Sequence, residues 1–323
     1  METAGHYPDT LMEAIRYFAD PDVCLDFVAK LRWADGVATC PTCGSKDVRF
    51  MASRRVWQCK ERHARRQFSV KVGTIFEDSP LPLDKWLAAV WMIANDKNGI
   101  SSYEISRALG VTQKTAWFML HRIRLAMQDP NSSDGLSGHV EADETFIGGK
   151  ARFMHKGKRA EKITGTGGMG KAAVMGLLQR HGPDGHSTVR ASVIASRRRQ
   201  ALHAKVRENV VPGSTLYTDA LASYNGLDAY YIHKVIDHAE TYVEGNVHTN
   251  SLENFWSLLK RALRGTYVSV EPFHLFRYLD EEAMRFNTRK ATDSARFQKV
   301  LGTVVGRRVT WNQLTGKEVS LPT

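Results

Sequence analysis

Three acidic residues lie far apart along the sequence, from Asp143 to Glu253, each at a position where a carboxylate could bind a cation or take part in catalysis. Asp143 lies in a strand-like run in which Glu141, Asp143 and Thr145 share one face. Asp219 ends a short apolar strand, and Glu253 lies beside the apolar stripe of a helical segment. Carboxylates that converge on one point repel one another unless cations lie between them. Their oxygen ligands favour Mg²⁺ or Mn²⁺, and two such ions can hold a phosphodiester and activate a nucleophile.

Each of these acids also has a purely structural interpretation. Asp143 could cap the end of a strand, and Asp219 could cap a helix. Glu253 could be the third residue of a capping arrangement that begins at Asn250. Their joint occurrence on a first strand, a later strand end and a late helix favours one shared site for metal-dependent chemistry on nucleic acid.

Cysteine spacing predicts a second metal site nearer the amino terminus. Cys40 and Cys43 form a knuckle followed by glycine, and Cys59 and His63 complete the pattern C-x2-C-x15-C-x3-H. This spacing predicts a structural zinc ribbon with three thiolate ligands and one imidazole ligand. The alternative is that Cys59 is a buried apolar residue and His63 a surface base. Cys24 lies in a helical apolar pattern and is expected to pack in the core.

The predicted ribbon is strongly basic. Residues 46–71 contain nine Lys or Arg and only two acidic residues, within a chain whose net charge is +11. Cations concentrated on a small rigid module suit contacts with DNA phosphates, and the alternative is a solvated basic face. The candidate DNA contacts in this segment are Arg54, Arg55, Arg65 and Arg66.

Residues 101–127 have the pattern of a helix-turn-helix. Gly110 permits the turn, and Thr112 can cap the second helix. A plain hairpin of two helices would have the same pattern. Four side chains at the start of the second helix are expected to be exposed and to face a DNA groove: Gln113, Lys114, Thr115 and Trp117.

Composition excludes several classes of protein. The 323 residues are 42% hydrophobic, which is enough for a sizeable core and for two or three domains. The longest apolar run, Trp86 to Ala94, is too short to span a bilayer, and no signal peptide is visible. Four cysteines do not make a disulfide scaffold and fit a reducing compartment. A cytoplasmic protein without a membrane partner is therefore expected.

Hydrophobic periodicity predicts an α/β fold and divides the chain into four parts. The parts are amino-terminal helices with the zinc ribbon over 1–80, the helix-turn-helix region over 81–130, a catalytic α/β domain over 136–290, and a carboxyl-terminal tail over 291–323. In the third part, strands are expected at 138–147, 172–179, 187–195, 214–219 and 230–236. Helices are expected at 197–209, 250–263 and 272–287. The Gly- and Lys-rich segment 148–171 is expected to be a mobile loop.

Taken together, these motifs resemble the DDE transposases of bacterial insertion sequences. The resemblance is to the ISXO2-like group, which has an amino-terminal zinc ribbon and a ribonuclease-H-like catalytic domain. It extends from about residue 20 to residue 290. The matching motifs are Gln67–Val70, Gly73–Glu77, Asp143–Gly149, Tyr217–Asp219, Glu253–Arg261 and Gly265–Tyr267.

The resemblance implies that Asp143, Asp219 and Glu253 form a triad that binds Mg²⁺ or Mn²⁺. It implies the element order strand, strand, strand, helix, strand, helix, strand, helix. It also implies that Lys260, seven residues after Glu253, contacts DNA. One departure concerns the ribbon, because the family pattern usually ends in C-x2-C, whereas here Cys59 and His63 have one more residue between them.

The family reaction implied by the resemblance is cleavage of the element's ends followed by joining to target DNA. The expected partners are double-stranded DNA, as transposon ends and target, and a second copy of the chain, since two ends must be joined. One alternative is a catalytically inactive, transposase-derived zinc-ribbon DNA-binding protein. The other is a ribonuclease-H-like nuclease for repair or RNA cleavage.

Overall fold

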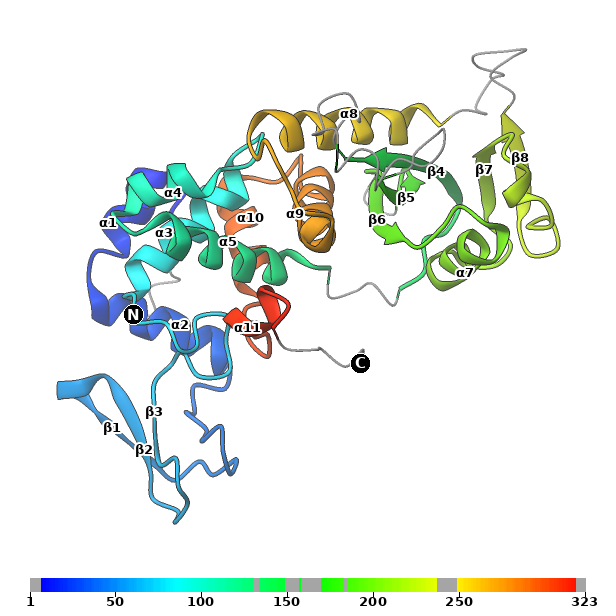
Figure 1. Cartoon of the computed structure of the whole chain (residues 1–323). Coiled ribbons are helices and arrows are strands. Elements are labelled where there is room, and N and C mark those ends of the chain that lie inside the picture. Colours follow the sequence, from blue (N-terminus) through cyan, green and yellow to red (C-terminus); the bar gives the residue numbers. More distant parts are fainter. Residues whose placement is uncertain are drawn as a thin grey trace. The chain divides into compact units, whose positions relative to one another are not determined.

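The chain folds into two compact units. The computed structural model describes residues 7–129, 134–148, 157, 170–182, 185–236 and 249–317 (Figure 1). One unit contains the residues up to Met127 together with those from Lys290 onward, and the other contains residues 128–289. Most of the segment expected to be a loop, 148–171, lies outside the described residues. Within the described part of the chain, no helix has the length and apolar character needed to cross a membrane.

The first unit is mainly helical. Its core is aromatic, because Phe297 packs against Phe18, Phe27 and Trp91 from three earlier segments. Gly110 ends one helix with a positive φ of 60°, at the turn that the sequence predicts. The helices are α1 (Leu11–Tyr17), α2 (Pro21–Arg32), α3 (Leu83–Asn95), α4 (Ser102–Leu109), α5 (Gln113–Met127), α10 (Asp293–Leu301) and α11 (Trp311–Leu314).

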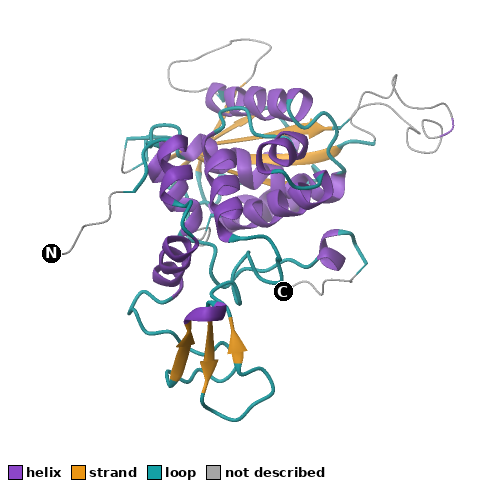
Figure 2. Ribbon diagram, turned by 90° about the vertical axis from the view of Figure 1, so that its left-hand side faces the viewer, coloured by secondary structure: helices purple, strands orange, loops and turns teal. Residues whose placement is uncertain are grey.

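A small antiparallel sheet also belongs to the first unit, and its three strands are visible side by side in Figure 2. The strands are β1 (Val48–Met51), β2 (Val56–Cys59) and β3 (Gln67–Phe68), with η1 (Ala52–Arg54) between the first two. Trp57 is paired with Phe68 across the sheet and stacks on its ring, while Trp33 meets Trp57 edge to face. These aromatic residues form the core of the ribbon and so do not serve as free stacking surfaces for bases.

The second unit is built on a mixed sheet of five strands, all of which the sequence predicts. The strands are β4 (His139–Ile147), β5 (Ala172–Arg180), β6 (Thr188–Ile194), β7 (Thr215–Asp219) and β8 (Ile232–Ile236). Their order is β6-β5-β4-β7-β8. The pairs β4–β5 and β5–β6 are antiparallel, whereas β4–β7 and β7–β8 are parallel.

Helices cover both faces of this sheet. On one face, α7 (Arg199–Asn209) and η3 (Ala222–Tyr224) share a core with Val140 and Ala142 of β4. On the other face lie α8 (Asn250–Gly265), η4 (Pro272–His274) and α9 (Leu275–Asn287), and Figure 1 shows α8 running along β4 and β5. The predicted helices are thus confirmed, with the last one beginning as a 3₁₀ turn.

A glycine in β5 lets α8 approach the sheet closely. Gly176 is paired with Asp143 of β4, so both lie on the face covered by α8. A Cβ atom at this position would lie 2.6 Å from the Trp256 ring and 2.9 Å from the Leu252 side chain. The absence of a side chain at Gly176 therefore allows the first turns of α8 to lie against the strand that carries Asp143.

Candidate functional site

Two of the predicted acids lie on neighbouring parallel strands, Asp219 as the last residue of β7 and Asp143 in the middle of β4, just beyond the part of β4 that pairs with β7. β4 and β7 are paired so that Glu141 lies opposite Tyr217, and Asp143 and Asp219 each follow that pair by two residues. Alternation along a strand therefore directs both acids to the face covered by α8. In open α/β sheets, binding sites form at the carboxyl ends of parallel strands.

Asp143 is held by hydrogen bonds to both carboxylate oxygens. Trp256 Nε1 donates to Oδ2 at 2.9 Å, and the backbone N–H of Glu144 donates to Oδ1 at 2.8 Å. Burial raises the pKa of the Asp143 carboxyl, and the charges of Asp219 and Glu253 raise this pKa further. The two hydrogen bonds lower it, but the net effect is a raised pKa. Both Asp219 and Glu253 therefore act electrostatically on Asp143.

Glu253 and Asp219 occupy different local settings. Glu253 lies exposed in the first turn of α8, and Asn250 is the first helical residue, so the capping arrangement proposed to begin at Asn250 does not apply. Asp219 accepts a hydrogen bond from the backbone N–H of Leu221 at 3.2 Å, which closes a local turn, whereas the N-cap of the following 3₁₀ turn is Leu221, so Asp219 is not a helix cap. A carboxylate that caps a turn with one oxygen still has the other available as a metal ligand.

Lys260 lies two turns after Glu253 on the same helix. Burial lowers the pKa of its amine, and the neighbouring Arg264 lowers it further, whereas Asp143 raises it. Lys171 adds to the lowering effect. Lys260 is thus close enough to Asp143, and to the cations Arg264 and Lys171, to be affected by their charges, and a cation at this position attracts a phosphate backbone.

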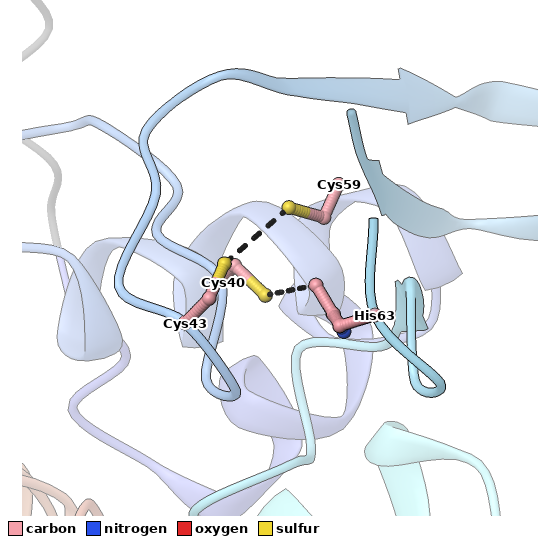
Figure 3. A group of neighbouring side chains, drawn as sticks. All are labelled: Cys40, Cys43, Cys59 and His63. Carbon is pink, nitrogen blue, oxygen red and sulfur yellow. Dashed lines mark hydrogen bonds between the residues drawn. The ribbon is translucent and has the colours of Figure 1, made fainter. Parts of the chain in front are cut away.

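The four predicted zinc ligands come together at one point, which confirms the Cys3His prediction. Figure 3 shows Cys40 and Cys43 on one loop facing Cys59 and His63. The Cys40 Sγ atom lies 3.5 Å from His63 Nε2, and the Cys43 Sγ atom lies 3.6 Å from Cys59 Sγ. All four ligand atoms lie within 4.8 Å of one another, and the cysteines form no disulfide. Three thiols and one imidazole are a donor set that suits tetrahedral zinc.

Among the described residues, this is the one group of three or more ligand side chains gathered tightly enough to hold a metal ion. Asp143, Asp219 and Glu253 do not form such a group, although the charges of Asp219 and Glu253 act on the Asp143 carboxyl. Cys24 is separate from the cluster. It is fully buried, its thiol donates to the Phe18 carbonyl at 3.1 Å, and burial raises its pKa to about 11, which confirms it as a core residue.

The four arginines of the ribbon differ in their contacts. Arg55 forms an ion pair with Asp22 at 2.6 Å, and Arg54 donates to the Gln67 side chain at 3.1 Å. Arg66 donates to two carbonyls, those of Cys59 at 3.0 Å and Lys60 at 3.2 Å. Arg66 therefore stabilises the loop between two zinc ligands, while Arg54, Arg55 and Arg65 are exposed.

The surface at the start of α5 differs from the sequence-based expectation. Lys114 is exposed as predicted, but Gln113, Thr115 and Trp117 are partly buried. Gln113 donates to Ser102 Oγ at 2.8 Å, while Trp117 packs edge to face on Trp311 of α11. The Lys114 amine lies 4.5 Å from the centre of the Trp311 ring. The expectation that all four side chains are exposed is therefore wrong for three of them: Trp117 is covered by the carboxyl-terminal segment, whereas Gln113 and Thr115 bond to Ser102 and Thr112 beside them.

Two further residues, Trp256 and Glu141, contact the site although no sequence motif indicates a role for them. Trp256 is a buried apolar residue of α8, yet its indole N–H reaches Asp143. Glu141 was placed on the face of Asp143, and its carboxylate contacts Arg180 and the backbone of Leu252. The sequence indicates only that Glu141 lies two residues before Asp143 on the same strand face. Its partners, Arg180 and Leu252, lie on other elements and cannot be predicted from that spacing.

Comparison with known proteins agrees with this arrangement. The family model described as ISXO2-like transposase domain matches residues 135–287, and that described as transposase zinc-ribbon domain matches residues 20–64. An uncharacterized protein in transposable element ISH50 of Halobacterium salinarum is 30% identical over 264 residues, which cover 78% of this chain and 86% of that protein. An uncharacterized transposase-like protein of Haemophilus influenzae is 35% identical over 103 residues, 31% of this chain and 83% of that protein.

Proposed function

We infer, since the chain belongs to the ISXO2-like transposases of insertion sequences, that it binds the ends of its element and catalyses metal-dependent DNA strand cleavage and strand transfer. The family itself implies a transposase that binds DNA. The observation that supports the finer proposal is the placement of Asp143 and Asp219 on adjacent parallel strands, each two residues beyond the paired Glu141 and Tyr217, with both Asp219 and Glu253 acting electrostatically on Asp143.

The order of elements in the second unit supports a ribonuclease-H-like catalytic domain over residues 136–290. Three strands, a helix and a strand follow one another as the family order requires. Between β7 and β8 the described chain has the 3₁₀ turn η3 where that order has a helix. We assign the chemistry to this domain and the recognition of DNA to residues 1–130.

In this proposal, Asp143, Asp219 and Glu253 hold the divalent cations and Trp256 keeps the Asp143 carboxylate oriented. When bound, Mg²⁺ or Mn²⁺ supplies an activated water and neutralises charge on the phosphodiester. Lys260 binds a phosphate of the DNA beside the acids. Metal-dependent hydrolysis and transesterification need no nucleophilic side chain, so the protein's part in this chemistry is to supply the carboxylates of β4, β7 and α8.

DNA recognition is assigned to the ribbon and to a helix-turn-helix formed by α4 and α5. The exposed Arg54, Arg55 and Arg65 supply cations for phosphates on the ribbon. On α5, Lys114 and Gln113 lie at the amino end, where a recognition helix meets bases. A homodimer is expected in the DNA complex because two element ends must be joined.

The proposal is tested with the zinc-loaded full chain and a duplex that carries the DNA flanking its own gene. With Mg²⁺ or Mn²⁺, we expect cuts at the element ends that free 3′-hydroxyls, and then joining to a target duplex. A duplex with scrambled ends is the control. Binding without cutting would favour the inactive DNA-binding protein, and equal cutting of unrelated DNA or RNA would favour the general nuclease.

Trp256→Phe is expected to slow cleavage about tenfold, since the variant lacks the N–H that holds Asp143 in place. Phenylalanine keeps most of the aromatic ring with which Trp256 fills the space over Gly176, so DNA affinity should not change. The matched control is Phe255→Leu, which alters the neighbouring core residue of α8 and should affect stability only. Single-turnover cleavage rates measure the effect, and equal rates for Trp256→Phe and wild type would contradict it.

A further inference from the structure

A buried ion pair beneath the proposed active site has no part in the chemistry described above. The Glu141 side chain is 0% exposed and that of Arg180 is 9% exposed, and Glu141 Oε1 lies 2.6 Å from Arg180 Nε. Apolar residues of similar size often stabilise a core as well as a buried ion pair does. The role of this pair therefore depends on its further contacts, which lie on two other elements of the unit.

The second oxygen of Glu141 reaches the start of α8. The backbone N–H of Leu252, the third residue of that helix, donates to Glu141 Oε2 at 2.9 Å. The residue before the helix, Thr249, forms no capping hydrogen bond through its side chain. Glu141 thus satisfies, from a neighbouring strand, a first-turn N–H that a side-chain cap would usually satisfy. A carboxylate is well suited to this position because it also interacts favourably with the helix dipole.

The same pair is connected to the third acid-bearing element. The Arg180 guanidinium lies 4.3 Å from the centre of the Tyr217 ring on β7. Tyr217 is itself fixed, since its hydroxyl lies 2.9 Å from His139 Nδ1 on β4. Tyr217 is 1% exposed, so its ring is enclosed by these neighbours.

The contacts of this pair fall next to all three proposed catalytic acids. Glu141 lies two residues before Asp143 on β4, and Tyr217 lies two residues before Asp219 on β7. The N–H of Leu252 immediately precedes Glu253 on α8. The Glu141–Arg180 pair therefore contacts each of the three elements that must be aligned for the acids to meet.

We propose that Glu141 is a positioning residue that caps α8 from β4 and thereby fixes Glu253 beside Asp143 and Asp219. The inference rests on the proposed function, because it concerns the same three carboxylates. It requires no contact between Glu141 and the cation or the DNA. If Glu141 has this role, the position of the Glu141 carboxylate, and not merely its charge, determines how well Asp143, Asp219 and Glu253 bind a divalent cation.

Glu141→Asp tests geometry separately from charge. The variant keeps the negative charge opposite Arg180 but is one methylene shorter, so it cannot reach both Arg180 and the Leu252 N–H as the wild type does. The matched control is Glu281→Asp, since Glu281 is equally buried and is paired with Arg285 within α9 of the same unit. Direct Mn²⁺ binding to the complex with the end duplex is measured by electron paramagnetic resonance, alongside the Mn²⁺ concentration that gives half-maximal cleavage.

We expect Glu141→Asp to weaken Mn²⁺ binding about fivefold to tenfold and to raise the Mn²⁺ requirement for cleavage equally. Glu281→Asp should change both values less than about twofold, whatever its effect on thermal stability. Hydrogen exchange at the Leu252 amide should quicken in Glu141→Asp alone. Equal shifts in the two variants, or no shift in Glu141→Asp, would overturn the positioning role.

The outcomes also separate this inference from the proposed function. If the wild type neither binds Mn²⁺ nor cuts the end duplex, the proposed function fails. If the wild type does both and Glu141→Asp behaves like the wild type, only the positioning role fails. Should Glu141→Asp not fold, Arg180→Lys replaces it, because lysine keeps the charge but loses the planar group that contacts both Glu141 and Tyr217. We expect Arg180→Lys, like Glu141→Asp, to weaken Mn²⁺ binding and to raise the Mn²⁺ concentration needed for cleavage.

Discussion

Asp143→Asn is expected to abolish strand cleavage, by at least about 1,000-fold, while binding of the element ends stays unchanged. The amide has nearly the same shape as the carboxylate, and its oxygen can still accept the hydrogen bond from Trp256, but its NH₂ group cannot accept the bond from the Glu144 N–H. The amide also lacks the negative charge that a divalent cation requires. Stability should change little, because the lost hydrogen bond is offset by removal of a charge that burial disfavours.

The measurement for Asp143→Asn is cleavage of the end duplex in Mg²⁺ and in Mn²⁺, with binding followed by gel mobility shift. Asp228→Asn is the matched control, an exposed acid of the same unit that should cut like the wild type. Magnesium-dependent cutting by Asp143→Asn at a rate near that of the wild type would show that the triad is wrongly assigned.

Cys43→Ser is expected to remove the zinc and to unfold the ribbon, while the second unit keeps its own thermal transition. The ribbon has only short strands and a small aromatic core, so its folding depends on the metal, which contributes on the order of 10 kcal/mol in small zinc domains. Serine keeps the shape of cysteine without providing the soft thiolate that zinc prefers. End binding should weaken because the basic surface loses its framework.

Metal analysis should find one zinc per chain in the wild type and none in Cys43→Ser. The control is Cys24→Ser, since Cys24 is a buried thiol outside the ligand cluster. That variant should lose stability in the first unit but retain its zinc. A wild-type protein without zinc, or a Cys43→Ser protein that keeps it, would contradict the assignment.

The regular elements and the zinc ligands could be predicted because their signals are local. The strands of the second unit have clear apolar alternation, so the opposite orientations of Ala142 and Asp143 follow from a period of two. The zinc ligands follow from spacing alone, because a knuckle and a second pair can reach one ion only in a ribbon.

The supporting contacts of the site could not be predicted because they join elements distant in the chain. The bond from Trp256 to Asp143 spans 113 residues, and that from Leu252 to Glu141 spans 111. Each depends on strand register and on how closely α8 approaches Gly176, which no local pattern encodes. The partial burial of Trp117 was missed for the same reason, since Trp311 comes from the far end of the chain.

The return of the chain to its first unit has a consequence for biosynthesis. Phe297 completes the aromatic core that Phe18 and Trp91 begin, and the Ile75 N–H bonds to the Val304 carbonyl. A ribosome therefore completes the first unit only after residues 128–289, which form the second unit, have been synthesised. A nascent chain released by a stop codon or a frameshift before residue 290 would lack part of the core of the first unit. Folding of the first unit is thus coupled to synthesis of the chain beyond the second unit.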